Sequence, residues 1–100
     1  MTSTELSVEQ LETAANKLKA IAHPIRIAII AHLEKEIELT VTKIHELLGI
    51  EQSTASHHLG ILKDKGVLKS KREGKNIFYS LKHEEVGKII ECMKNCAEKT

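Results

Sequence analysis

The feature that most constrains the fold of this chain is Gly49, which lies between two short amphipathic segments. Residues 40–48 carry apolar side chains at helical spacing and end directly before this glycine, which readily takes the left-handed conformation that terminates a helix. A second helix is expected from Gln52 to near Gly66, with Ile50 placed to pack between the two. Two short helices joined by such a tight turn are the helix-turn-helix pattern.

The second of these segments has one apolar face and one polar face. Ala55, Leu59 and Leu62 recur at helical spacing on the apolar side. Polar side chains of modest size suit base edges in the major groove of DNA, where Gln can bind adenine through two hydrogen bonds and Ser or His can contact either partner. We therefore expect this helix to read duplex DNA through Gln52, Ser53, Thr54, Ser56, His57 and Lys63.

The charges of the chain are spread unevenly although the net charge is only +1. Residues 61–75 hold six basic and two acidic side chains, whereas residues 1–60 hold five basic side chains and eight glutamates. A solvated lysine-rich turn would explain this excess, but its position directly after the polar helix favours contact with phosphates. Tyr79 and Phe78 are the only aromatic residues. The chain therefore has few aromatic side chains on which unpaired bases could stack, and duplex DNA is favoured as the ligand over single strands or RNA.

Helices are also predicted before the helix-turn-helix pattern. Ser7 and Gln10 have the spacing of a capping box, which predicts a first helix from about residue 8 to residue 22. Pro24 suits the first position of a second helix, which should continue to about residue 35, and the acidic stretch 34–38 should close it. His23 is expected to cap this second helix, and His58 is expected to face the core.

The remaining elements are a hairpin and a last helix. Residues 67–72 and 76–81 read as two strands joined by a turn at residues 73–75, and residues 84–98 read as a helix with one apolar side. A basic hairpin after a reading helix is a wing. The predicted fold is a single domain over residues 1–100, mainly α with a small β-hairpin. Because both terminal helices carry apolar stripes, we expect them to pair with their copies in a twofold dimer.

No segment suggests a membrane or a secreted protein. The longest apolar run is residues 27–31, far too short to cross a bilayer, and the first ten residues lack the features of a signal peptide. Cys92 and Cys96 are the only cysteines, and two thiols four residues apart in a helix do not make a secreted disulfide framework. A cytoplasmic location is expected.

Three stretches of the chain resemble a known family. AIAHPIRIAII at residues 20–30, TVTKIHELLGIEQSTASHHLGILKDKGVL at 40–68 and REGKNIFYSL at 72–81 are similar to the ArsR/SmtB family of bacterial winged-helix repressors. The similarity spans residues 18–81. It implies a homodimer that occupies operator DNA and leaves it when an inducer binds, with two reading helices about 34 Å apart on an imperfect palindrome.

The resemblance also implies roles for individual residues. Two positions depart from the family pattern: His45 replaces a small residue, and Glu51 replaces the usual Ser cap of the reading helix and brings negative charge toward DNA. Thr40 or Thr42 is expected to cap the helix that ends at Gly49. The implied base contacts are Gln52, Ser53, Ser56 and His57; the phosphate contacts are Thr40, Thr42, Lys63, Arg72 and Lys75, with Lys71 added from the basic hairpin.

The metal sites of the family are only partly present. Thr40, Val41 and Thr42 stand where thiolate sensors have Cys-Val-Cys, so that site is absent. Zinc sensors of the family join two chains through residues of the last helix, and the matching positions here are His83, Glu85, Cys96 and Lys99. A lysine ammonium has no lone pair for zinc, so His83, Glu85 and Cys96 would form an incomplete tetrahedral site unless water completed it.

Thiol chemistry is a second sensing hypothesis. Cys92 and Cys96 lie about 5–6 Å apart at Cβ in a regular helix, which exceeds ordinary disulfide geometry, although copies from two chains could meet. Redox and persulfide sensors of the family pair a last-helix Cys with a second-helix Cys, and the matching second-helix position is Ala31. Soft metals or arsenite remain ligands that thiolates favour. The alternative is that both are small residues buried at an interface.

Other functions are weighed against the repressor. A cysteine with a histidine could act as nucleophile and base, but no phosphate-binding loop or carboxylate pair accompanies them, and so short a chain leaves little room for a substrate cavity. An enzyme is therefore not expected. Two alternatives stay open: a repressor with no inducer site of its own, and a winged-helix module that binds protein partners.

Overall fold

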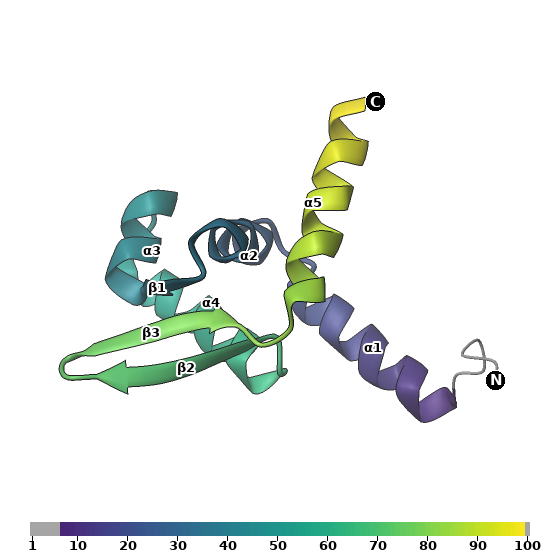
Figure 1. The fold of residues 1–100 in the computed structure, drawn as a ribbon, viewed down its shortest axis with the longest axis horizontal. Helices are drawn as coiled ribbons and strands as arrows, with labels where there is room; N and C mark the ends of the chain where they lie inside the picture. The colour runs from purple at the N-terminus through teal and green to yellow at the C-terminus, as the bar shows by residue number, and fades with distance from the viewer. Residues whose placement is uncertain (1–6, 100) are drawn as a thin grey trace.

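The structure is a computed structural model that describes residues 7–99 and contains five helices and three strands (Figure 1). Because the helix-turn-helix is followed by a hairpin, the architecture is a winged helix, as the sequence predicts. The elements in chain order are α1 (Val8–Ile21), α2 (Pro24–Glu36), β1 (Glu38–Thr40), α3 (Val41–Leu48), α4 (Gln52–Asp64), β2 (Leu68–Glu73), β3 (Asn76–Leu81) and α5 (Glu84–Lys99).

The helix boundaries follow from local capping chemistry. Ser7 and Gln10 form the predicted capping box at the start of α1, and His23 Nδ1 accepts the Ile25 N–H at the start of α2, where Pro24 occupies the first helical position. Gly49 ends α3 in the left-handed conformation, with φ of 66°. The turn between α3 and α4 therefore has the geometry that the sequence predicted.

The sheet contains one strand more than the sequence analysis predicted. β1 pairs antiparallel with β3, which gives a three-stranded sheet in the order β1-β3-β2 rather than a lone hairpin. Ile37 ends α2 with φ of 64°, an uncommon value for a β-branched residue, and so turns the chain sharply into β1. β1 has only three residues and begins at the end of the acidic stretch 34–38, so it gave no strand pattern of its own.

The hydrophobic core lies between α2, α3, α4 and the inner face of the sheet. Ile29, Ile30 and Leu33 of α2 are buried against Leu59 and Leu62 of α4. Ile44, Val67, Leu68 and Ile90 complete the same cluster. This core fixes α4 by its apolar face and leaves its polar face free.

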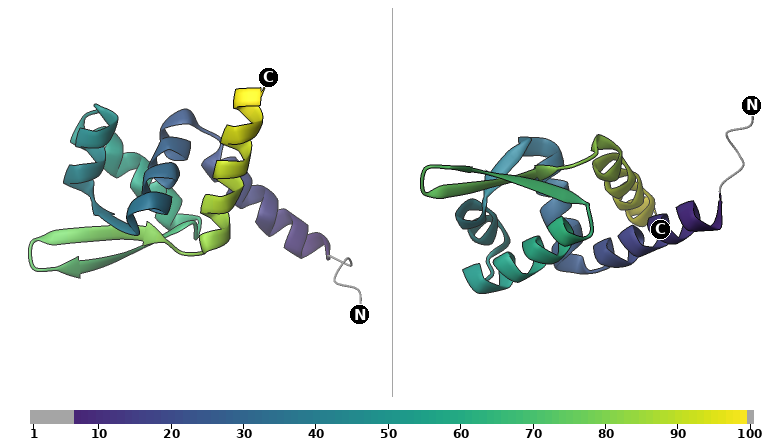
Figure 2. Two further views of the ribbon diagram at one scale, coloured as in Figure 1. Left: turned by 45° about the horizontal axis from the view of Figure 1, so that its top comes forward. Right: turned by 90° about the horizontal axis from the view of Figure 1, so that it is seen from below.

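α1 and α5 extend from the side of this body opposite the hairpin tip (Figures 1 and 2). Both helices leave large apolar side chains in solvent; on α5, Ile89 is 48% and Met93 57% exposed. Gly87 allows α5 to pack closely against α2, because a Cβ at this position would overlap Glu34 Cγ of α2. No helix within residues 7–99 combines the length and the apolar character that a membrane crossing requires.

Candidate nucleic-acid interface

The outward face of α4 is polar and exposed. Gln52, Ser53, Ser56 and His57 are exposed, whereas Ala55, Leu59 and Leu62 on the opposite face have no solvent-accessible surface. Within residues 7–99, the side chains of Gln52, Ser53 and Ser56 have no hydrogen-bond partner. Their donors and acceptors are therefore available to a ligand.

The first turn of α4 carries a feature that the sequence analysis singled out. Glu51 occupies the N-cap position and makes no side-chain capping bond, so it supplies charge without satisfying the free N–H groups of the helix. Thr54, the third residue of the helix, is half-buried and thus less accessible than its neighbours. The exposed polar face therefore consists mainly of Gln52, Ser53, Ser56 and His57.

The start of α3 adds hydroxyl groups. Thr40 caps α3 by accepting the Lys43 N–H at 3.1 Å, which answers which of the two predicted threonines is the cap. The Thr40 hydroxyl keeps its own proton to donate, and Thr42 is exposed in the first turn. His45 is half-buried, and its Nδ1 lies 3.1 Å from the Ile50 carbonyl, so this departure from the family pattern ties α3 to the turn before α4.

The wing divides its basic residues between two faces, because side chains alternate along a strand. Arg72 pairs with Ile77 and shares the face of Leu68, which is buried in the core beside α4. Lys71 pairs with Phe78 on the other face, where its ammonium lies 3.6 Å from Glu38 and 3.2 Å from Glu73. The hydrogen bond to Glu73 and the charge of Glu38 raise the pKa of Lys71.

The predicted phosphate contacts therefore do not form one group. Lys63 is exposed near the end of α4, Lys75 is exposed at the hairpin turn, and Arg72 is exposed on the core-side face. Lys71 lies on the opposite face and already has two carboxylate partners. Sequence reasoning missed this division, because Glu38 belongs to the strand that it did not predict.

A buried polar cluster behind α4 was also missed. Arg26 of α2 donates from Nε to Nδ1 of His58, and from Nη1 to the Ala20 carbonyl, each at 2.9 Å. His58 is 7% exposed, as its predicted inward orientation requires. The sequence carried a usable indication in the His-Pro-Ile-Arg run and the paired histidines of α4, but nothing in it linked Arg26 to His58.

The proposed sensing residues all lie on or just before α5. Cys92 and Cys96 are exposed in the single chain, as are His83 and Glu85. Within residues 7–99 of one chain, no three His, Cys, Asp or Glu side chains gather closely enough to hold a metal ion. The zinc set of the family joins two chains, so His83, Glu85 and Cys96 stay a prediction for the dimer.

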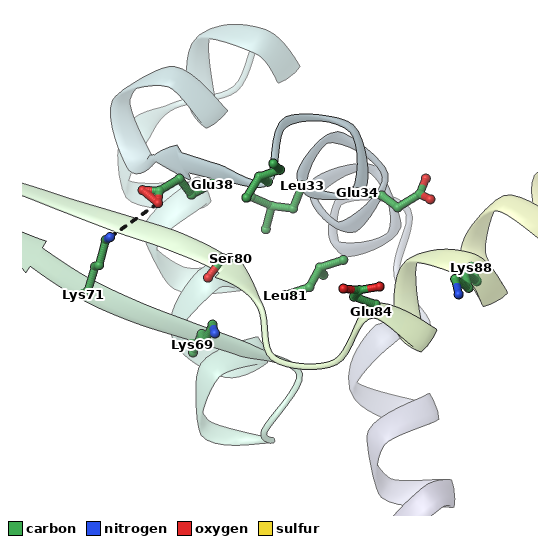
Figure 3. A pocket seen from close by; sticks show the side chains of 10 residues that line it. Leu33, Glu34, Glu38, Lys69, Lys71, Ser80, Leu81, Glu84 and Lys88 are labelled. Atoms are coloured by element: carbon green, nitrogen blue, oxygen red, sulfur yellow. Dashed lines mark ion pairs between the residues drawn. The ribbon is translucent and has the colours of Figure 1, made fainter.

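A cavity of about 490 Å³ lies between the end of α2, the outer face of the sheet and the start of α5 (Figure 3). Its rim mixes three carboxylates with three ammonium groups, and Lys71 spans it toward Glu38. It lies on the face of the wing away from Arg72, so it is separate from the exposed surface of α4. The charged residues that line it are Glu34, Glu38, Glu84, Lys69, Lys71 and Lys88.

A helix-turn-helix with a free polar helix and an adjacent basic wing defines a winged-helix DNA-binding protein. Comparison with known proteins agrees: a family described as helix-turn-helix domain matches residues 21–71. The transcriptional repressor PagR of Bacillus anthracis is 42% identical over 83 residues, which are 83% of each chain. The HTH-type transcriptional regulator YgaV of Escherichia coli K12 is 36% identical over 94 residues, covering 92% of this chain and 95% of the other.

Solved structures show the same relationship. The crystal structure of PagR aligns with a TM-score of 0.80 at 40% identity, covering 87% of this chain and 99% of that one. A homodimeric winged helix-turn-helix domain from Mycobacterium bovis, described as a possible ArsR-family regulator, aligns with a TM-score of 0.81 at 26% identity, covering 98% and 92%. The chain belongs to the ArsR/SmtB family of winged-helix transcriptional regulators, which consists of DNA-binding proteins rather than enzymes.

Proposed function

We propose that this protein is a homodimeric repressor that binds a specific double-stranded operator through α4 and the wing. The observation that carries the proposal is the exposed face of α4, where Gln52, Ser53 and Ser56 have no partner in the described chain. Exposed polar groups on a helix whose other face is locked in the core match what base readout requires. Because its ligand is chromosomal DNA, we place the protein in the cytoplasm.

The contacts divide by role. Gln52, Ser53, Ser56 and His57 read base edges, with Thr54 at the margin of this surface. Phosphates are bound by exposed cations and hydroxyls, which fix the orientation of α4 but carry no sequence information. Lys71 joins them only by giving up Glu38 and Glu73, and is the weakest member of the set. The phosphate set is Thr40, Thr42, Lys63, Lys71, Arg72 and Lys75.

Dimerisation supplies the second reading helix. The exposed apolar side chains of α1 and α5 need a cover, and pairing with their copies provides one: Val8, Leu11, Leu18, Ile89 and Met93. A twofold axis through these helices would set two copies of α4 on successive turns of one duplex, about 34 Å apart.

Operator binding is tested by fluorescence anisotropy on the protein's own promoter and on a scrambled duplex. The double variant Ser56→Ala, His57→Ala should lose most of the preference for the promoter, because a good base contact contributes about 1–3 kcal/mol of discrimination. Lys35→Ala, an exposed lysine at the end of α2, is the control and should bind as the wild type does. Equal binding of wild type to both duplexes would refute sequence-specific readout.

The inducer site is proposed at Cys92 and Cys96, which are exposed on one flank of α5 next to the apolar stripe. Thiolates there would bind a soft metal or arsenite, or would react with an oxidant. A zinc site would add His83 and Glu85 across the dimer. Operator release should follow addition of one of these species to the reduced dimer and disappear in Cys92→Ser and Cys96→Ser. Release by none of them would leave a repressor without its own ligand switch.

A further inference from the structure

A single side chain of α2 joins α1 to α4. The Arg26 guanidinium donates from Nη1 to the carbonyl of Ala20, in the last turn of α1, and from Nε to Nδ1 of His58, in the middle of α4. Both distances are 2.9 Å. The proposed dimerisation helix and the proposed reading helix are thus bonded through one residue.

The His58 ring is held from two further sides. The His23 ring lies 4.6 Å from it between centroids, and the His57 ring lies 5.3 Å away in an edge-on arrangement. His23 is itself fixed because its Nδ1 accepts the Ile25 N–H that caps α2. A continuous series of contacts therefore runs from the start of α2 to His57 on the exposed face of α4.

This arrangement requires His58 to be neutral. Arginine only donates hydrogen bonds, so Nδ1 of His58 must carry a lone pair and the ring proton must reside on Nε2. A second proton on the ring would replace the acceptor with a donor and set two cations in contact. The hydrogen bond and the protonated ring cannot coexist.

The surroundings of His58 favour the neutral ring. Burial lowers the pKa of His58, and the charges of His23, Arg26 and His57 lower it further. The charged groups acting on the ring from α2 and its cap, and from α4, are therefore all basic, and the α1 group at this junction is the uncharged Ala20 carbonyl. Because the pKa lies below the ordinary value of 6.5, the bonded arrangement is stable above 6.5 and is lost as the pH falls from there through the lowered pKa.

We propose that Arg26 is a positioning residue for DNA readout, which acts through neutral His58 to hold α4 against the end of α1, so that operator affinity falls when His58 takes up a proton. The inference rests on the proposed function, because it assumes that α4 reads DNA.

The test is operator affinity measured from about pH 7.5 to about pH 5.5, with a scrambled duplex alongside. Wild-type affinity for the operator should fall by about fivefold or more, the lower end of the range typical for two coupled sites, and by more than the affinity for the scrambled duplex does. His58→Asn keeps an acceptor near the position of Nδ1 but does not titrate, so its affinity should stay near the wild-type neutral value at every pH. His32→Asn removes a half-buried histidine of α2 that has no part in the proposed DNA contacts; it is the matched control, and its affinity should fall with pH as that of the wild type does.

The outcomes separate the two proposals. A wild type whose specific affinity is unchanged in acid, or a His58→Asn variant that weakens as the wild type does, would overturn the role of His58. Absence of operator preference at neutral pH would instead refute base readout by α4. Arg26→Gln should bind the operator less tightly at neutral pH while remaining dimeric by sedimentation; wild-type affinity in this variant would overturn the role of Arg26.

A measurement on the wild-type protein avoids any dependence on variant folding. Nitrogen-15 NMR of the histidine rings should show Nδ1 of His58 unprotonated at neutral pH, a titration midpoint below 6.5, and amide shifts along α4 that follow the same midpoint. A protonated Nδ1 in the neutral dimer, or α4 amides that ignore the titration, would contradict the proposal.

Discussion

α4 and α5 are both amphipathic helices, yet the fold treats them in opposite ways. α4 buries its apolar face and exposes a polar one, whereas on α5, over residues 84–98, only Gly87 and Ile90 are buried, and Ile89 and Met93 remain in solvent. A polar face held out by a complete core is suited to a polar ligand. An apolar face left without a core is suited to a protein surface, here a second copy of the chain.

Substitutions on the two helices should therefore affect different properties of the protein. Apolar changes on the inner side of α4 should act on folding and changes on its outer side should act on recognition, because Ala55, Leu59 and Leu62 are buried in the core whereas Gln52, Ser53 and Ser56 are exposed. On α5, the apolar side acts on assembly. The division predicts four results that differ in size and in the quantity measured.

The largest effect should come from removing core volume under α4. Leu59→Ala should lower the free energy of unfolding by about 2–5 kcal/mol, because Leu59 is fully buried and its neighbours can refill the space only in part. Chemical denaturation followed by circular dichroism measures this. Ser56→Ala, one turn earlier on the exposed face, should change stability by no more than about 0.5 kcal/mol. Equal losses in both variants would break the assignment of the two faces.

Charge placed on the apolar side of α5 should dissociate the dimer. Ile89→Asp should weaken self-association by about 2 kcal/mol or more, which is roughly thirtyfold in the dimer dissociation constant. Sedimentation over a range of concentrations checks this, and operator binding should weaken in parallel because half-sites would bind separately. Asn95→Asp adds the same charge on the opposite side of α5 and should remain dimeric. Dissociation of both variants would mean that charge alone, rather than this face, controls assembly.

The parts predicted from sequence are those set by local chemistry. Ser7 marks a helix start through its side-chain hydroxyl, Pro24 through its fixed φ and Gly49 marks a helix end through its left-handed backbone; the apolar period of α4 identified its buried side. The missed features all join residues far apart in the chain. β1 exists only by pairing with β3, and Arg26 meets a histidine 32 positions away. No local pattern encodes either contact.

A substitution of Glu51 should have a smaller effect, which changes both the stability of the protein and its affinity for the operator. Glu51→Ser should stabilise the protein by about 1 kcal/mol, since serine at the N-cap can accept an N–H of the first turn that glutamate leaves free. Operator affinity should rise as well, and most at low salt, because one negative charge leaves the start of α4. Glu46→Ser removes the same charge from α3 without adding a cap, so it should not stabilise the protein. Equal melting temperatures for the two variants would refute the capping argument.

The smallest expected effect concerns the two faces of the wing, of which only the face that carries Arg72 is expected to contact DNA phosphates. Arg72→Ala should weaken binding to every duplex and reduce the slope of log affinity against log salt by about 1.8, because the dimer loses one phosphate contact in each of its two chains. Lys71→Ala should leave that slope nearly unchanged, because its ammonium is already neutralised by Glu38 and Glu73. Titrations at several salt concentrations compare the two. If Lys71→Ala reduced the slope as much as Arg72→Ala does, the ion pairs would have to open on DNA, and both faces of the wing would meet the duplex.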